Sequence, residues 1–241
     1  MACYTRRYWE DIPGTLIFPS YWNYVNNANN LYHRAKEIKL AVYVIMFDNF
    51  FNKLSKGMSL TEADKTIFSQ HITVKKLRKR QYLLHEGEIC KSVAFVSKGI
   101  LRSYLTDEKT NEHIIQFAPE GWFIADLYSF ITDDYSTLNI DAIETSELIL
   151  ISKAAHVYLE NAVPAFFKFY YMQYRSAYIM LQKRLTDIFT LSAEEKYVKL
   201  LGIYPDIMQR VPQHMIASYL GLTPETLSRV RKKLVIKKTG T

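Results

Sequence analysis

Cysteine is scarce in this chain. Cys3 and Cys90 are the only two in 241 residues, and they form no C-x-x-C pair. This usage argues against a disulfide framework and against a cysteine-rich metal or iron–sulfur site. We therefore expect no iron–sulfur cluster and a reducing, cytoplasmic location.

Long apolar runs are also missing. The stretch from Ile38 to Phe51 is interrupted by Lys39, Asp48 and Asn49. It falls short of the roughly 20 mostly apolar residues that a membrane span needs. No cleavable signal is evident either, so we expect no membrane partner.

Motifs of common enzyme classes are absent. None of the six histidines forms the H-x-H pair of a metal-dependent cupin, and the sequence has neither a G-x-S-x-G elbow nor a phosphate loop. We expect no enzyme activity, no metal site and no cofactor.

What the chain does carry is positive charge and apolar residues. The net charge is +7, the sequence pI is near 9.2 and 49% of residues are hydrophobic. A packed core and a polyanionic partner both fit these values. The basic run from Lys75 to Arg80 is either a DNA or polymerase contact or, as we favour, a solvated strand edge.

Residues 1–45 show no sustained periodicity, and we treat them as an N-terminal extension of unassigned role. Translation beginning at Met46 is a hypothesis. Ser59 and Glu62 have capping-box spacing for a short helix that ends near Phe68.

Residues 46–162 are predicted to form a compact antiparallel barrel or roll with flanking helices. Short runs rich in β-branched and aromatic residues read as strands, with glycines between them. The runs are Val93 to Val96, Ile100 to Leu105, His113 to Phe117 and Leu148 to Ile151.

Residues 163–190 are predicted to form one long helix. Apolar residues recur there at alternating steps of four and three, which is a heptad seam. The seam predicts a parallel homodimer, although a helix packed only on its own β-roll fits the same periodicity. Its residues are Phe167, Tyr171, Tyr174, Tyr178, Leu181, Leu185 and Ile188.

Residues 191–241 are predicted to hold a helix-turn-helix. Ser192 and Glu195 have capping-box spacing for a helix from Ala193 to Leu201. Further on, Gly221 supplies a turn, and Thr223 is a good N-cap for a second helix that starts at Pro224.

The second helix of this motif offers a surface for reading DNA. Glu225 can accept a hydrogen bond from cytosine, and Arg229, one turn later, can grip guanine. The alternative is an i,i+4 surface salt bridge between these two residues. The full set of predicted DNA contacts is Thr223, Glu225, Thr226, Ser228, Arg229, Lys232 and Lys233, with Lys237 and Lys238 as further phosphate contacts.

From about Phe47 to Lys233 the chain resembles the Crp/Fnr family of transcription regulators. Three stretches carry the resemblance along with the two helical regions: L-L-H-E-G-E from Leu83, F-V-S-K-G-I-L-R from Phe95 and G-W-F from Gly121. The pattern E-x-x-S-R, typical of the Fnr-like branch, reads Glu225 to Arg229. The resemblance implies an α+β fold with a cyclic-nucleotide-binding-like β-roll, a dimerisation helix and a winged-helix-like reader whose wing is short or absent.

The resemblance weakens at the phosphate-binding cassette of the family. Where its members carry F-G-E-L and then R-S-A or R-T-A, this chain has Ile124 to Leu127 and Ser136 to Leu138. Ser136 replaces the arginine that pairs with the cyclic phosphate, so cyclic AMP is not expected to bind. The candidate pocket for an unknown small-molecule effector, whose aromatic members fit plain core equally, comprises Trp122, Phe123, Asp126, Tyr135 and Ser136.

The resemblance further implies a homodimer on pseudo-palindromic double-stranded DNA, with RNA polymerase as another candidate partner. We expect a sequence-specific transcription regulator. The alternative is a protein-interaction module that has lost its ligand and whose helix-turn-helix does not read DNA.

Overall fold

The computed structural model describes the backbone of residues 45–239 and side chains up to residue 234. Apart from its last residue, the predicted extension 1–45 lies outside this range, and the Met46 hypothesis stays a prediction. Residues 45–55 form a helix. Met46, Phe50 and Leu54 of this helix are buried, so the packed part of the chain includes the segment directly after the extension.

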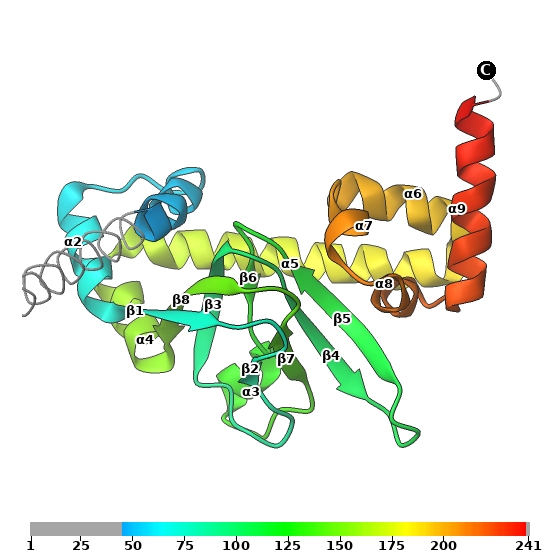
Figure 1. Ribbon diagram of the computed structural model, residues 1–241. Coiled ribbons are helices and arrows are strands. Elements are labelled where there is room, and N and C mark those ends of the chain that lie inside the picture. The colour runs from blue at the N-terminus through cyan, green and yellow to red at the C-terminus, as the bar shows by residue number, and fades with distance from the viewer. Residues whose placement is uncertain (1–44, 240–241) are drawn as a thin grey trace, which may run out of the picture. The chain divides into compact units, whose positions relative to one another are not determined.

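Two four-stranded antiparallel sheets form the β-roll (Figure 1). Their orders are β1-β8-β3-β6 and β2-β7-β4-β5. Three of the predicted strands are confirmed within the longer strands β3, β5 and β8, and the fourth is confirmed as β4 except for Ile100, which precedes it. The two sheets enclose an apolar core to which both contribute. The strands are β1 Ile72–Leu77, β2 Tyr82–Leu84, β3 Ser92–Lys98, β4 Leu101–Thr106, β5 Glu112–Ala118, β6 Phe123–Ile124, β7 Asn139–Ala142 and β8 Ser146–Ser152.

The basic run begins on an edge strand. β1 pairs only with β8, and Lys76 forms an ion pair with Glu147 of that neighbour at 2.7 Å. Arg78 and Arg80 follow the strand and are exposed. This placement agrees with the favoured interpretation, in which charged side chains protect the free edge of a sheet.

Gly99 joins β3 to β4 at a point where no side chain fits. Its φ is +94°, a left-handed value. A Cβ at this position would lie 2.2 Å from the Ser146 Oγ. Glycine is therefore required both by its conformation and by the close approach of the neighbouring strand.

Helices flank the β-roll, and all elements described after β8 are helices (Figure 1). The helix α2 is capped by Thr61 and Asp64 and ends at His71, so the cap expected at Ser59 and the end expected at Phe68 were both wrong. The helices are α2 Glu62–His71, α3 Leu127–Thr132, α4 Lys153–Ala162, α5 Pro164–Thr190, α6 Ala193–Ile203, α7 Ile207–Arg210, α8 Gln213–Leu220 and α9 Pro224–Thr239.

The long helix is confirmed as α5, which has 27 residues and so spans about 40 Å. Its first turns are fixed to the roll by buried aromatic rings. Phe166 lies edge-on to Phe68, with ring centroids 5.1 Å apart, and Phe169 and Tyr170 contact Phe123. The helix ends at Thr190, and Leu191 is extended. The predicted capping box of Ser192 and Glu195 then starts α6.

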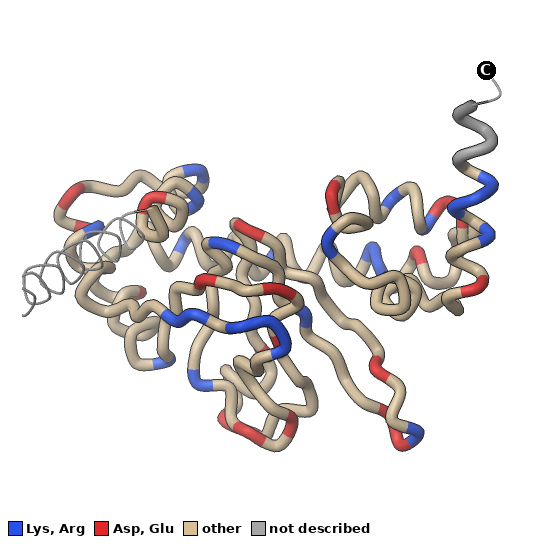
Figure 2. The backbone as a smooth tube through the Cα atoms, in the orientation of Figure 1, with Lys and Arg blue, Asp and Glu red and all other residues tan. Residues whose placement is uncertain are grey.

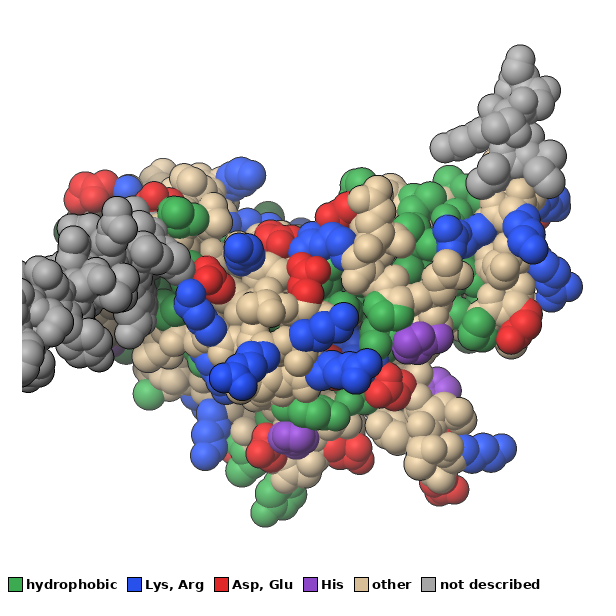
Figure 3. Space-filling model, in the orientation of Figure 1, with side chains coloured by type: hydrophobic (Ala, Val, Ile, Leu, Met, Phe, Trp, Pro, Cys, Tyr) green, Lys and Arg blue, Asp and Glu red, His purple; other side chains and the backbone are tan. Residues whose placement is uncertain are grey.

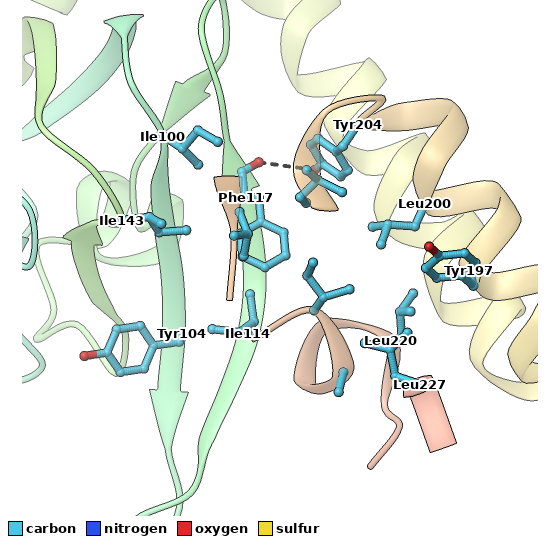
Figure 4. Close-up of a cluster of buried hydrophobic side chains, with 14 of the residues drawn as sticks. Ile100, Tyr104, Ile114, Phe117, Ile143, Tyr197, Leu200, Tyr204, Leu220 and Leu227 are labelled. Atoms are coloured by element: carbon cyan, nitrogen blue, oxygen red, sulfur yellow. Dashed lines mark hydrogen bonds between the residues drawn. The ribbon is translucent and has the colours of Figure 1, made fainter. Parts of the chain in front are cut away.

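The β-roll and the C-terminal helices share one apolar cluster (Figure 4). The outer face of the second sheet contributes one part of it, and the C-terminal helices contribute the other. Tyr204 donates a hydrogen bond from its hydroxyl to the Phe117 carbonyl oxygen at 3.2 Å across this junction. The buried members are Ile100, Tyr104, Ile114, Phe117, Ile143, Tyr197, Leu200, Tyr204, Ile207, Val211, Ile216, Ala217, Leu220, Leu227 and Val230.

Candidate nucleic-acid interface

The predicted helix-turn-helix is present as α8, a turn and α9. Gly221 ends α8 with φ +67°, which is the left-handed conformation that favours glycine. The buried side chains of Leu227 and Val230 in α9 pack in one cluster with Ile216 and Ala217 of α8. The small side chain of Ala217 suits a close crossing of the two helices.

The start of α9 is capped as its sequence predicts. The Thr223 Oγ1 accepts a hydrogen bond from the Thr226 backbone N–H at 3.2 Å, and Pro224 occupies the first helical position. These two residues fix where the helix begins. They consequently fix which side chains form its first outward turn.

Glu225 and Arg229 are both exposed on α9. No ion pair joins them, and the Arg229 guanidinium donates instead to the Thr226 hydroxyl at 3.2 Å. Hydrogen bonds from its own backbone N–H and from Thr223 lower the pKa of Glu225, with a smaller contribution from the charge of Arg229. A charged acceptor and a charged donor are therefore presented one turn apart.

The remaining predicted DNA contacts differ in accessibility. Lys232 is exposed and Ser228 is half-buried, whereas Lys233 is exposed but forms an ion pair with Glu194 of α6. Basic positions recur along α9 (Figure 2), and basic side chains stand on its outer side (Figure 3). The side chains of Lys237 and Lys238 lie outside the described residues. In the part of the chain that the structure describes, no strand follows α9 as a wing.

The helix-turn-helix is held against the β-roll through the free edge of β5. The Ser218 hydroxyl on α8 donates to the Glu112 carbonyl oxygen at 2.7 Å and accepts from the Ile114 backbone N–H at 3.0 Å. Arg184 on α5 donates to the carbonyl oxygens of Ile114 and Ile115. Side chains from two helices thus occupy edge groups that would otherwise be open to another strand.

A second polar contact joins α7 to the turns of the roll. Arg210 bonds with Glu120 at 2.8 Å and with Asp206 at 2.9 Å, and it also pairs with Glu144. Burial raises the pKa of Glu120, but the hydrogen bonds and charge of Arg210, together with hydrogen bonds from the backbone N–H groups of Glu120 and Gly99, outweigh this effect, so the net direction is down. Sequence reasoning missed Ser218, Arg184 and Arg210, because nothing in their local spacing marks them.

The heptad seam of α5 is exposed over most of its length. Six seam residues are 49–68% exposed: Phe167, Tyr171, Tyr178, Leu181, Leu185 and Ile188. Tyr174 is half-buried and its ring contacts Tyr170. Beyond its first turns, therefore, the helix does not bury this stripe against its own β-roll.

The candidate effector residues separate in the structure. Trp122 packs against Tyr204 in the shared cluster, Phe123 packs on Phe95 and the start of α5, and Tyr135 is 72% exposed. Only Asp126 and Ser136 come together. The predicted aromatic lining does not form around them.

Asp126 and Ser136 are hydrogen-bonded to each other at the position where the family cassette would bind phosphate. The buried Ser136 hydroxyl donates to the Asp126 Oδ2 at 2.7 Å. The other Asp126 oxygen accepts from the backbone N–H groups of Tyr128 and Ser129 and caps α3. Residues 124–138 contain three aspartates and no lysine or arginine, so this stretch offers a phosphate no cation of its own.

Between residues 45 and 239, no group of three or more His, Cys, Asp and Glu side chains could hold a metal ion. Over the same range, no helix has the length and apolar character needed to cross a membrane.

The comparison with family profiles places a known domain in this fold. Residues 74–159 match the cyclic nucleotide-binding domain. A search of curated protein sequences finds no significant match.

Solved structures extend the likeness beyond that domain. FixK2 from Bradyrhizobium japonicum has a TM-score of 0.59 and 19% identity, covering 69% of this chain and 86% of its own. The c-di-GMP responsive global regulator CLP of Xanthomonas campestris has a TM-score of 0.59 and 17% identity, covering 74% and 93%. A protein from Eubacterium rectale assigned to the crp/fnr family of transcriptional regulators has a TM-score of 0.58 and 14% identity, covering 74% and 85%.

The chain therefore has the fold of the Crp/Fnr regulators. It is α+β, with a cyclic nucleotide-binding domain followed by a helical C-terminal region, as the sequence predicted. At sequence identities below one fifth, the similarity to these structures shows the fold alone. The function has to be argued from the chemistry of the chain's own residues.

Proposed function

We propose that this protein is a sequence-specific DNA-binding transcription regulator that acts as a homodimer. The observation that carries the proposal is the outward face of α9. Glu225, Arg229 and Lys232 are exposed there, while Leu227 and Val230 anchor the opposite face in the core. A helix held in this way can enter the major groove without exposing its apolar side.

Each residue on this face has a chemical role in the proposal. Arg229 grips the O6 and N7 of a guanine, Glu225 accepts from a cytosine N4, and Ser228 contacts a neighbouring base or phosphate. Lys232 contacts phosphate and adds affinity without sequence preference. Lys233 can contact phosphate only after its ion pair with Glu194 breaks, so it contributes less to DNA affinity than Lys232 does.

Dimerisation supplies the second half of the binding site. Two copies pair through the exposed seam of α5, which removes apolar side chains such as Tyr178 and Leu181 from water. Two recognition helices then face a pseudo-palindrome with half-sites about 34 Å apart. RNA polymerase remains a candidate partner of the bound dimer.

The effector is unidentified, and the chemistry of the cassette supports a ligand other than a cyclic nucleotide. Asp126 and Ser136 already bond to each other, and the stretch supplies no cation for a phosphate. The exposed reading face also favours a binding protein over an enzyme.

Selection of sites from random double-stranded DNA by the purified full chain tests the proposal. We expect recovery of a pseudo-palindrome that contains a G·C pair in each half. The alternative, a protein-interaction module whose helix-turn-helix does not read DNA, predicts recovery of no common sequence. Repeating the selection with Glu225→Ala should relax the preference at one position of each half-site.

A further inference from the structure

A groove separate from the nucleotide cassette lies between α5, α6 and α8. Its volume is about 400 Å³, which falls within the range of small-molecule sites. It lies on the side of α5 that faces the C-terminal helices, and Ile188 is its only residue from the predicted seam.

The groove is apolar inside. Ile179 and Met180 line it from α5, Leu200 and Ile203 from α6, and Leu220 from α8. Ile179, Met180 and Ile203 are each at least 38% exposed, so apolar side chains meet solvent in a concave site. Such a surface favours a ligand with an apolar body.

The rim of the groove is basic. Lys183, Arg184, Lys196 and Lys199 line it, and Asp187 is the only acidic residue that does so. Asp187 is already neutralised by its ion pair with Lys199.

Two of these cations remain able to bind a ligand. Lys183 is exposed and forms no ion pair with a described residue. Lys196 uses one hydrogen bond, to the Ile188 carbonyl oxygen at 3.0 Å, and its ammonium group keeps further donors. Arg184 already donates three hydrogen bonds to backbone carbonyl groups of β5 and α8, so it is held away from a ligand.

We propose that this groove binds an amphipathic carboxylate, with its acyl chain against Met180 and Leu200 and its carboxylate at Lys183 and Lys196. The apolar interior of the groove matches the acyl chain of a fatty acid, and the unneutralised cations at its rim match the carboxylate. The proposal concerns binding alone, so it does not depend on whether α9 reads DNA.

Calorimetric titration of the full chain with decanoate, below its micelle concentration, tests the proposal. We expect saturable binding of one decanoate per chain and no comparable binding of decyltrimethylammonium, which has the same tail and the opposite charge. Absence of decanoate binding, as would follow if a second copy closed the groove in a dimer, overturns the proposal. So does equal binding of the cationic probe.

Variants then locate the site. Lys183→Glu reverses one rim charge and should weaken decanoate binding by about tenfold, the effect of losing a charge-assisted contact. Arg175→Glu makes the same change on α5 outside the groove and should leave binding within about twofold. Met180→Trp fills the trough and should abolish binding, with Ile203→Trp as the substitute if that variant does not fold. Unchanged binding in Lys183→Glu and in the filled variant overturns the assignment.

Discussion

Arg184 of α5 lies over the ring of Tyr219 of α8, with its guanidinium carbon 4.0 Å from the ring centroid. It also donates to the Tyr219 carbonyl oxygen at 3.0 Å. With its bonds to Ile114 and Ile115, one side chain therefore connects α5, the edge of the β-roll and α8, the first helix of the helix-turn-helix.

Replacing Arg184 by lysine should destabilise the chain although the charge is kept. Lysine lacks the planar fork that reaches several carbonyl oxygens at once and stacks on an aromatic ring. We expect a loss of about 1–3 kcal/mol in the free energy of unfolding, measured by urea denaturation. Arg175→Lys is the matched control, because Arg175 is exposed on the same helix. Equal effects of the two changes would contradict this role.

Arg210→Gln should destabilise the chain in a salt-dependent way. The variant leaves Glu120, Glu144 and Asp206 without their shared cation. Because these groups are partly solvated, we expect a loss of about 1 kcal/mol at low salt that shrinks as salt screens the network. Urea unfolding at two salt concentrations measures it, and a loss independent of salt would argue against an electrostatic cause.

His156 should make the fold sensitive to acid. Burial lowers its pKa from 6.5 to about 4, and its neighbours Phe130, Phe166 and Tyr170 offer the Nε2 no hydrogen-bond partner. The unfolded chain therefore binds a proton between pH 6.5 and 4 that the folded chain does not, so stability falls as pH falls through this window.

The size of the His156 effect follows from the pKa difference. Each unit corresponds to about 1.4 kcal/mol, so the contribution approaches about 3 kcal/mol at pH 4. His156→Phe should flatten the fall of the unfolding free energy between pH 6.5 and 4, while His214→Phe, at an exposed position, should not. An unchanged pH profile in His156→Phe would show that burial of this histidine carries no acid penalty.

Leu181→Glu should separate the proposed dimer. Leu181 is 61% exposed in the single chain, and a seam glutamate would face its copy in the partner. We expect a monomer by analytical ultracentrifugation and about a hundredfold weaker binding to a palindromic site, because the second half-site no longer adds its affinity. Thr186→Glu, off the seam of the same helix, is the control. A Leu181→Glu chain that stays dimeric would place the interface elsewhere.

Local patterns predicted much of this fold. The heptad repeat gave the extent of α5, and Thr223 with Pro224 gave the start of α9, because both signals lie within a few residues of what they specify. The cap of α2 was missed since Thr61 and Asp64 compete with Ser59 and Glu62 at the same spacing. Sequence pattern alone does not rank the two pairs.

The packing of the helix-turn-helix on the β-roll could not be predicted in this way. Ser218 and Glu112 are 106 residues apart, and Arg184 contacts Ile114 across 70 residues. Leu101 to Tyr104 are buried on both faces of β4. Arg102 and Ser103 interrupt the apolar run by which a strand covered on both faces is recognised in a sequence. The aromatic effector pocket was inferred from Trp122 and Phe123, but these rings serve the junctions with the C-terminal helices and with α5.

The most direct test is quantitative binding of native chain, Arg229→Ala and Lys232→Ala to the selected palindrome and to copies with one G·C pair replaced. We expect Arg229→Ala to lose about 1–3 kcal/mol on the palindrome and to become indifferent to the replaced pair. Lys232→Ala should weaken binding to all sequences about equally and reduce the salt dependence. Equal losses for both variants on every sequence would contradict the assignment of α9 as a reading helix.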